Sequence, residues 1–487
     1  MNFGRLRLSG RLEKAFVVAA FVLATLPGWQ SADAPPGHEP EQKPLVQVIW
    51  AVDYLLVFAM LALRRSEVLP VIARSRLLWA MLLWVLMSAG WSAEPAATLR
   101  HGIALTGTTL FGIYVATRFS LDEQLPLAAT ALTIVAMLSL AVALVLPKYG
   151  IAIDDTGIMW QGIYATKNVL GRWMALAVVV MFLGLSGGRW RSPTGSRAGG
   201  KRPETSSFQS APLSGRFSAM VDVPRPAQGS IVPGPEPPAT GLPARRATWP
   251  CGFRDMLLAA FGFLLAVGLL WLTRSRTAQL ACLSVLGLSI FYRVLRWHAL
   301  RTMSLLMYAA AAGGALLTWI IADPKVFLGA MGKSSTLTNR IPLWGLVLEA
   351  IGKRPWLGYG YSSFWQGWHG DSAHICRVAG WIPPHAHNGF LDVCLDLGLV
   401  GLTIFLLGVV FALCRAVRSA RRTTTVGGLW PITFLTFLLL YNLTESLILR
   451  QHNLFWLLYV AATLSRPEQA AGQSGVAAIA SEPPPPR

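Results

Sequence analysis

The sequence predicts an all-α, polytopic integral membrane protein with about twelve transmembrane helices and one large folded loop on the outer side. Two observations lead to this fold class: 54% of the 487 residues are hydrophobic and only 13% are charged, whereas about 25% are charged in an ordinary soluble domain. A membrane-spanning helix uses about 20 apolar residues, so the chain is long enough for about twelve spans with their loops. This composition excludes a soluble globular protein, a disordered chain and a collagenous one.

Apolar runs of suitable length begin close to the N-terminus. Four basic residues, Arg5, Arg7, Arg11 and Lys14, precede the first run at 15–29, as they would in a signal peptide. Because no small-residue cleavage site follows and many more spans do, we expect a retained first helix. The further predicted spans lie at 45–63, 77–92, 99–117, 125–146, 168–186, 255–273, 277–292, 303–321, 391–414, 429–447 and 452–465.

The basic residues predict which side each loop faces. If the spans alternate, the short connections RRSEVLPVIARSR, RVLRWHALR and RAVRSARR fall on the same side as the basic N-terminus, whereas the loop at 30–44 has a single Lys. Cytoplasmic loops of membrane proteins are enriched in Lys and Arg. We therefore expect both termini in the cytoplasm, and we attribute the net charge of +19 to topology and not to nucleic-acid binding.

Two segments lack hydrophobic periodicity. Residues 187–254 are rich in Pro, Gly, Ser and Arg, and the tail at 466–487 ends in SEPPPPR. Such stretches cannot bury enough apolar surface to offset their ordering entropy, so we expect disordered cytoplasmic segments, although the basic loop could also contact a lipid surface. The predicted organisation is an N-terminal bundle at 1–186, three helices within 255–321 and three more within 391–465.

The outer loop at 322–390 has a different composition, because it contains five of the 19 tryptophans. Aromatic residues at this density can pack, so we expect the loop to fold. Within it, TLTNRIPLWGLVLEAIGKRP predicts a helix that has Pro342 in its first turn and ends at Gly352 and Pro355. Arg340 then lies near the helix N-terminus, where backbone N–H groups favour anions.

Basic residues on the outer side need an explanation, since the inner side holds most of them. Arg274 and Arg276 lie in LTRSRTAQ, the tight outer junction between the spans at 255–273 and 277–292. Ionisable residues at membrane depth indicate function, although arginine side chains can also extend to lipid headgroups. Guanidinium groups bind phosphate oxygens bidentately and stay charged, so a lipid-linked diphosphate is a natural partner.

The densest polar cluster is in PPHAHNGFLDVCLDLGLVG. His385, His387 and Asn388 precede the next membrane helix, and Asp392 and Asp396 share one face of it because they are four residues apart. A histidine that titrates near neutrality could remove a proton from a sugar hydroxyl. The alternative is that these residues only cap the helix.

Five motifs occur in order along the chain: GIYATKNVLGRWMAL (162–176), LTRSRTAQL (272–280), NRIPLWG (339–345), KRPWLGYGYSSF (353–364) and HNGFLDVCLDLGLVG (387–401). Together they resemble the O-antigen ligase and Wzy-type polysaccharide polymerase superfamily. The ending TESLILRQHNLFWLLYVA (444–461) makes the chain similar to exopolysaccharide polymerases of the ExoQ type. The N-terminal spans match this superfamily only in hydrophobic character.

The resemblance implies an integral membrane glycosyltransferase that needs no metal, cofactor or nucleotide sugar. Such enzymes take a glycan from an undecaprenyl diphosphate carrier on the periplasmic side and transfer it to an acceptor hydroxyl. The residues that match the superfamily's motifs are Lys167-Asn168, Ser275-Arg276, Arg340 and His387-Asn388. Asp396 stands where the superfamily usually has Glu, which keeps the charge and changes the geometry.

We therefore predict an inverting, metal-independent polymerisation of lipid-linked repeat units at the periplasmic face of the bacterial inner membrane. In this mechanism His387 is the base for the acceptor hydroxyl, and His385 or Asp396 orients it. The donor diphosphate is bound by Arg274, Arg276, Arg340 and Lys167. Further partners would be membrane lipid and, in the cell, a polysaccharide copolymerase and export proteins.

Two other functions fit part of the sequence. A ligase that transfers glycan to lipid A-core would use the same chemistry. A transporter or flippase of lipid-linked sugars would instead show inverted repeats and charges at mid-membrane, and the sequence shows neither.

Overall fold

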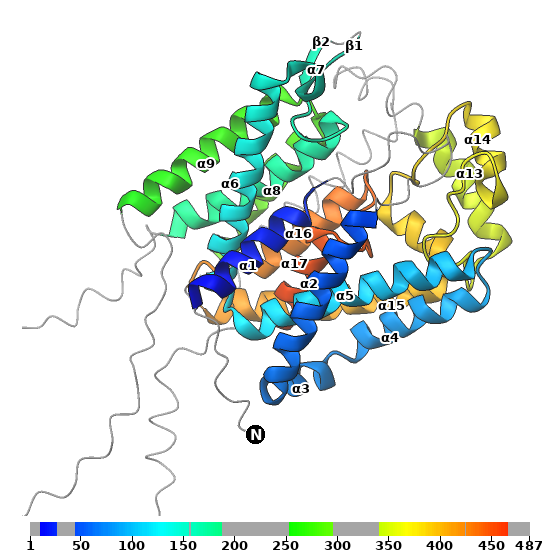
Figure 1. Ribbon diagram of the computed structural model, residues 1–487, viewed down its shortest axis with the longest axis horizontal. Helices are drawn as coiled ribbons and strands as arrows, with labels where there is room; N and C mark the ends of the chain where they lie inside the picture. Colours follow the sequence, from blue (N-terminus) through cyan, green and yellow to red (C-terminus); the bar gives the residue numbers. More distant parts are fainter. Residues whose placement is uncertain are drawn as a thin grey trace, which may run out of the picture. The chain divides into compact units, whose positions relative to one another are not determined.

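The computed structural model describes residues 10–26, 44–154, 157–187, 253–295, 340–423 and 425–465. Within these ranges the chain is mostly helical, and each predicted span that they include overlaps a helix (Figure 1). The predicted span at 303–321, most of the loop at 187–254, the first part of the outer loop and the C-terminal tail lie outside the described residues.

The helices follow the apolar runs. The first half of the chain forms α1 (Gly10–Leu23), α2 (Pro44–Leu63), α3 (Arg65–Arg74), α4 (Arg76–Met87), the short 3-10 helix η1 (Ser88–Gly90), α5 (Pro95–Arg118), α6 (Leu121–Val145), α7 (Pro147–Gly150) and α8 (Lys167–Gly187). The second half forms α9 (Phe253–Leu272), α10 (Arg276–Leu295), α13 (Arg340–Lys353), the 3-10 helix η3 (Gly370–Ser372), α14 (Ala373–Ala379), α15 (Gly389–Arg422), α16 (Trp430–Asn442) and α17 (Leu454–Leu464).

Four of the described helices, α2, α6, α8 and α15, are long and apolar enough to cross a membrane. Helices α3 and α4 would together form a fifth span, bent by 80°. The apolar parts of α9, α10, α16 and α17 are shorter. These helices are those of a membrane protein, whereas the number of twelve spans stays a prediction.

Two short elements depart from the sequence prediction. The connection at 64–76 is itself helical, because α3 fills most of it and continues into α4 through the bend at Ser75. An antiparallel hairpin, β1 (Ile151–Asp154) and β2 (Gly157–Trp160), adds strands to a chain that was predicted to be all-α. The two strands read IAID and GIMW and do not alternate apolar with polar residues, which is the sequence signal of a strand.

The hydrophobic core is centred on α8. Buried residues make up 72% of its apolar window, against 28% in α2 and 33% in α15. Trp173 of α8 stacks on Phe455 of α17, with ring centroids 4.8 Å apart. Helix α8 is therefore an interior helix, and α2 and α15 keep apolar faces that a lipid bilayer would cover.

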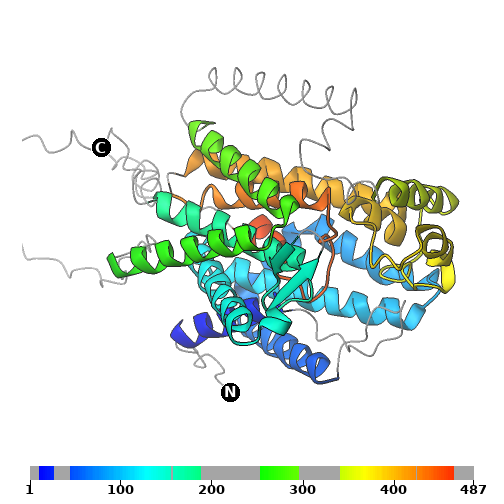
Figure 2. The same cartoon turned by 90° about the horizontal axis from the view of Figure 1, so that it is seen from above.

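The described part of the outer loop has a hydrophobic cluster of its own, as its aromatic content predicts. Leu343 and Val347 of α13 pack with Tyr359, Phe364 and Ile375. Helices α13 and α14 lie side by side in both views (Figures 1 and 2). Which side of a membrane this loop faces stays a prediction.

Helix α15 is broken at Gly398, where φ is +66°. The amides of Tyr359 and Gly360 donate to the carbonyls of Leu395 and Asp396 at 2.8 and 2.9 Å. A Cβ at Gly398 would lie 2.1 Å from the Trp356 carbonyl oxygen, so only glycine fits. The KRPWLGYGY segment therefore fixes the position of the first half of α15. This half begins directly after the polar residues His387 and Asn388.

Candidate functional site

The two histidines lie directly before α15 in a segment that is held from both sides. The Asp392 carboxylate accepts from the Ala386 amide at 3.0 Å, and the Trp344 indole donates to the Ala386 carbonyl at 2.9 Å. His387 has a left-handed φ of 51°, which costs energy in a non-glycine residue and persists only when the surroundings impose it. As a result the rings of His385 and His387 meet edge to face with centroids 4.2 Å apart.

Burial keeps both imidazoles neutral at neutral pH. Desolvation, and then the positive charge of Arg340, lowers the pKa of His387 from 6.5 to about 4. The pKa of His385 is also lowered by burial, with further contributions from His387 and nearby arginines. His385 Nδ1 accepts from the His387 amide at 3.1 Å, so its proton is on Nε2. His387 Nδ1 is buried and has no hydrogen-bond partner among the described residues.

Arg340 is paired with a buried carboxylate next to the histidines. It is the first residue of α13, and its guanidinium lies 3.2 Å from Glu445 Oε1 and donates to the Thr444 carbonyl at 2.7 Å. The Glu445 carbonyl in turn accepts from the Gly389 amide at 3.0 Å. The pair thus links α13, the start of α15 and the segment between α16 and α17. Arg340 lies at a helix N-terminus, as the sequence predicts.

Ligand atoms of His385, His387 and Glu445 lie within 4.8 Å of one another, which is close enough for a metal ion. The Arg340 guanidinium already supplies a positive charge to Glu445. A divalent cation would therefore have to displace this guanidinium or lie beside it, against electrostatic repulsion. We assign no metal to these residues.

Asn388 caps α15. Its side-chain oxygen accepts from the amides of Phe390 and Leu391 at 3.1 and 3.3 Å, which is the N-cap pattern. The capping interpretation therefore accounts for Asn388, whereas His385 and His387 contribute no side-chain cap to this helix.

Asp396 lies on α15 four residues after Asp392. It lines a small cavity with Asp392, Tyr361 and Arg450, so the two aspartates share one helix face, as their spacing predicts. The rings of His385 and Trp381 lie 4.2 and 6.2 Å from the His387 ring, centroid to centroid. Of the two groups considered for orienting the base, His385 has this ring contact with His387.

The other predicted residues gather where α8 begins beside the junction of α9 and α10. Ser275 is buried, and its hydroxyl donates to the Asn168 side-chain oxygen at 2.9 Å. Arg276 is the first residue of α10, and the Lys167 amino group lies against Met159 of β2. The Arg274 guanidinium lies over Gly157 at the start of β2.

Arg172 connects these two groups and was not singled out from the sequence. It lies on α8 one residue after Gly171, which packs against Ser275, and its positive charge is close enough to lower the pKa of His385. The Arg172 Nε is buried without a hydrogen-bond partner among the described residues. The signal was present in the sequence, since Arg172 is an ionisable residue within a predicted span.

Comparisons with known proteins match a part of the chain that contains several of these residues. Residues 261–406 match the family model described as O-antigen ligase. The exopolysaccharide production protein ExoQ of Rhizobium meliloti is 34% identical over 158 residues, which are 31% of this chain and 36% of that protein. Two proteins provisionally named polysaccharide ligases are each 38% identical, one from Rickettsia prowazekii over 100 residues and one from Rickettsia conorii over 71 residues.

These matches confirm the resemblance that the five motifs predict. Over the matched region the chain is similar to the O-antigen ligase and Wzy-type family and to ExoQ. The family region contains Arg274, Arg276, Arg340 and both histidines, whereas Arg172 lies outside it. The matches span 36%, 25% and 17% of the lengths of these relatives.

Proposed function

We propose that this protein polymerises undecaprenyl-diphosphate-linked oligosaccharide units at the periplasmic face of the inner membrane. The observation that carries the proposal is the convergence of two neutral imidazoles with Arg340, Arg172 and Glu445 at the start of α15. A proton acceptor beside fixed positive charges is what glycosyl transfer from a diphosphate requires, because one reactant loses a proton while the other leaves as an anion.

In the proposed reaction an acceptor hydroxyl attacks the anomeric carbon of the donor glycan. The bond from this carbon to the phosphate oxygen breaks, and its electron pair leaves with undecaprenyl diphosphate. The hydroxyl proton passes to His387. One displacement inverts the anomeric configuration, and no metal takes part.

The positive charges act on the leaving group. Arg276 and Arg340 are each the first residue of a helix, where the helix dipole adds to the charge of the guanidinium. Arg172 lies on α8 close enough to lower the pKa of His385, and Lys167 opens α8. We assign these residues, together with Arg274, to the diphosphate, where fixed donors stabilise the charge as it develops.

The donor also prepares the base. A pKa of about 4 makes His387 a weak proton acceptor in the free protein. A bound diphosphate brings negative charge next to Arg340 and so offsets the cation that lowers this pKa. Binding of the donor should therefore raise the pKa of His387 towards the pH at which a base works best.

A ligase that delivers glycan to lipid A-core is the second candidate, because the family description and the names of the Rickettsia relatives refer to ligases. Inactivating the gene in its host distinguishes the two functions. Loss of a polymerase leaves single repeat units on the lipid carrier, whereas loss of a ligase leaves long chains there. Long carrier-linked chains in a His387→Ala strain would exclude the polymerase. Normal extracellular polymer after inactivation of the gene would exclude both functions.

A further inference from the structure

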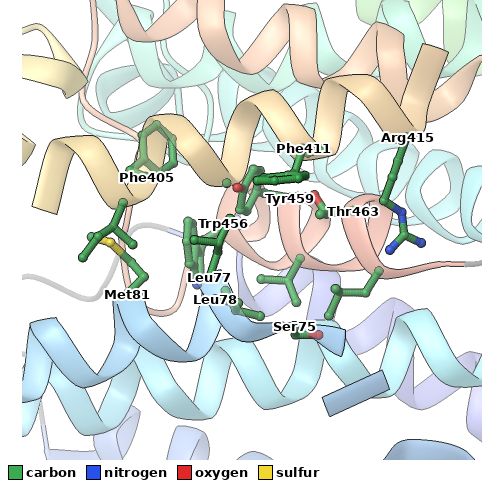
Figure 3. Close-up of a pocket in the computed structure, with 15 residues that line it drawn as sticks. Ser75, Leu77, Leu78, Met81, Phe405, Phe411, Arg415, Trp456, Tyr459 and Thr463 are labelled. Carbon is green, nitrogen blue, oxygen red and sulfur yellow. The ribbon is translucent and has the colours of Figure 1, made fainter. Parts of the chain in front are cut away.

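A cavity among the described residues lies far along α15 from the histidines. It has a volume of about 110 Å³ and is enclosed by α4, α15 and α17. Its walls are apolar for most of its length, with Met81, Phe405 and Trp456 among the lining residues (Figure 3). This volume is several times the share of one water molecule, about 30 Å³, and an apolar cavity takes apolar ligands more readily than water.

One end of this cavity is polar and positively charged. Figure 3 shows Arg415 of α15, Thr463 of α17 and Ser75 before α4 together at one end, and Met81 and Phe405 at the other. The Arg415 guanidinium donates to the Ser465 carbonyl at 3.2 Å, and it keeps its positive charge at any relevant pH. The buried Thr463 hydroxyl has no hydrogen-bond partner among the described residues.

Both segments that form this end come from connections predicted to be cytoplasmic. Ser75 lies between the exposed Arg74 and Arg76, at the 80° bend between α3 and α4. Arg415 opens the basic stretch RAVRSARR at the end of α15. From Leu399 to Arg415 the helix rises about 24 Å, which is most of the thickness of a bilayer's hydrocarbon core. On the predicted topology Arg415 lies at the cytoplasmic headgroups, opposite to the half of α15 that carries the site.

We propose that this cavity binds an anionic phospholipid of the cytoplasmic leaflet. An acyl chain lies between Met81, Phe405 and Trp456, and the phosphate accepts from Arg415 and from the Thr463 hydroxyl. Charge complementarity selects this occupant, because basic pockets between transmembrane helices on the cytoplasmic side suit anionic headgroups. An acyl chain also fills apolar space that neighbouring side chains leave empty.

The proposal is tested by native mass spectrometry of the full-length purified protein with equal amounts of dioleoyl phosphatidylglycerol and dioleoyl phosphatidylcholine. The two lipids have the same chains, so any preference reports the headgroup. We expect the protein to retain phosphatidylglycerol about fivefold better, as one basic residue near a membrane surface provides. Arg415→Gln should abolish this preference, and Arg415→Lys should keep most of it.

Two further variants locate the site. Arg421→Gln removes an exposed charge from the same helix end and should leave the preference unchanged. Gly408→Leu fills the cavity and should lower the number of bound lipids of either kind by one. The proposal is overturned if wild type shows no preference, or if Arg421→Gln and Arg415→Gln have equal effects. Displacement of phosphatidylglycerol by undecaprenyl phosphate would also overturn it, since the cavity would then hold a prenyl chain.

Discussion

The pKa of the proposed base gives a quantitative test of the site. Burial and the charge of Arg340 lower the pKa of His387 from 6.5 to about 4. At about 1.4 kcal/mol per pH unit, this difference corresponds to about 3 kcal/mol between the protonated and neutral forms. Burial is the larger of the two causes. Replacing Arg340 by Gln should therefore raise the pKa of His387 while leaving it below 6.5.

The assay is the pH dependence of kcat/KM in reconstituted vesicles, which reports the ionisation of the free enzyme. Activity should fall as the pH decreases through the pKa of His387, because a protonated imidazole cannot accept the hydroxyl proton. Arg340→Gln should move this acid limb to higher pH even though it also lowers the overall rate. Glu445→Gln removes the negative partner of Arg340 and should move the limb to lower pH.

Arg377→Gln is the matched control, because it removes an exposed arginine from the same loop and should leave the limb in place. The reasoning is refuted if the limb does not move in Arg340→Gln, or if it moves equally in Arg377→Gln. Either result would mean that Arg340 does not set the ionisation of His387.

Three further predictions concern the framework of the site. Gly398→Ala should lower the unfolding free energy by about 2 kcal/mol or more, because alanine is strained at positive φ and its Cβ meets a carbonyl. Gly352 faces open space, so Gly352→Ala should not lower the unfolding free energy in the same thermal unfolding series. Asp392→Asn should cost about 1–3 kcal/mol, since it removes a charged acceptor from buried donors, and it should reduce turnover more than donor affinity. Ser120→Ala should cost about 1 kcal/mol through the lost helix cap without changing turnover, and a change in turnover would count against a purely structural role.

The positions of the helices follow from the sequence because hydrophobic runs of this length have few alternatives. The helix Arg340–Lys353 was predicted with its proline in the first turn, and it begins and ends close to the expected residues. The break at Gly398 was not predictable. It depends on the distant segment around Trp356, whose carbonyl occupies the space of a Cβ, and a single sequence does not show such an encounter.

Several individual residues of the site were predictable from the sequence, but most of their contacts with one another were not. The histidines and Arg340 stand out as polar residues beside membrane helices, and the structure brings them together. Their partners were not evident, because Glu445 and Arg172 are far away in the sequence and become neighbours only when α8, α13 and the connection before α17 pack. The contact of His385 with His387 also depends on the path of the chain between Ala386 and α15, where the Ala386 amide donates to the Asp392 carboxylate.

The most direct measurement of the central claim is a reaction with purified protein in vesicles and a synthetic undecaprenyl-diphosphate-linked repeat unit. Glycan length and released undecaprenyl diphosphate are counted together, with His374→Ala as the control because His374 is an exposed histidine of the same loop. The account predicts one carrier released for each new glycosidic bond in wild type and in His374→Ala, and no product in His387→Ala. Full product in His387→Ala, or carrier release without new bonds, would contradict it.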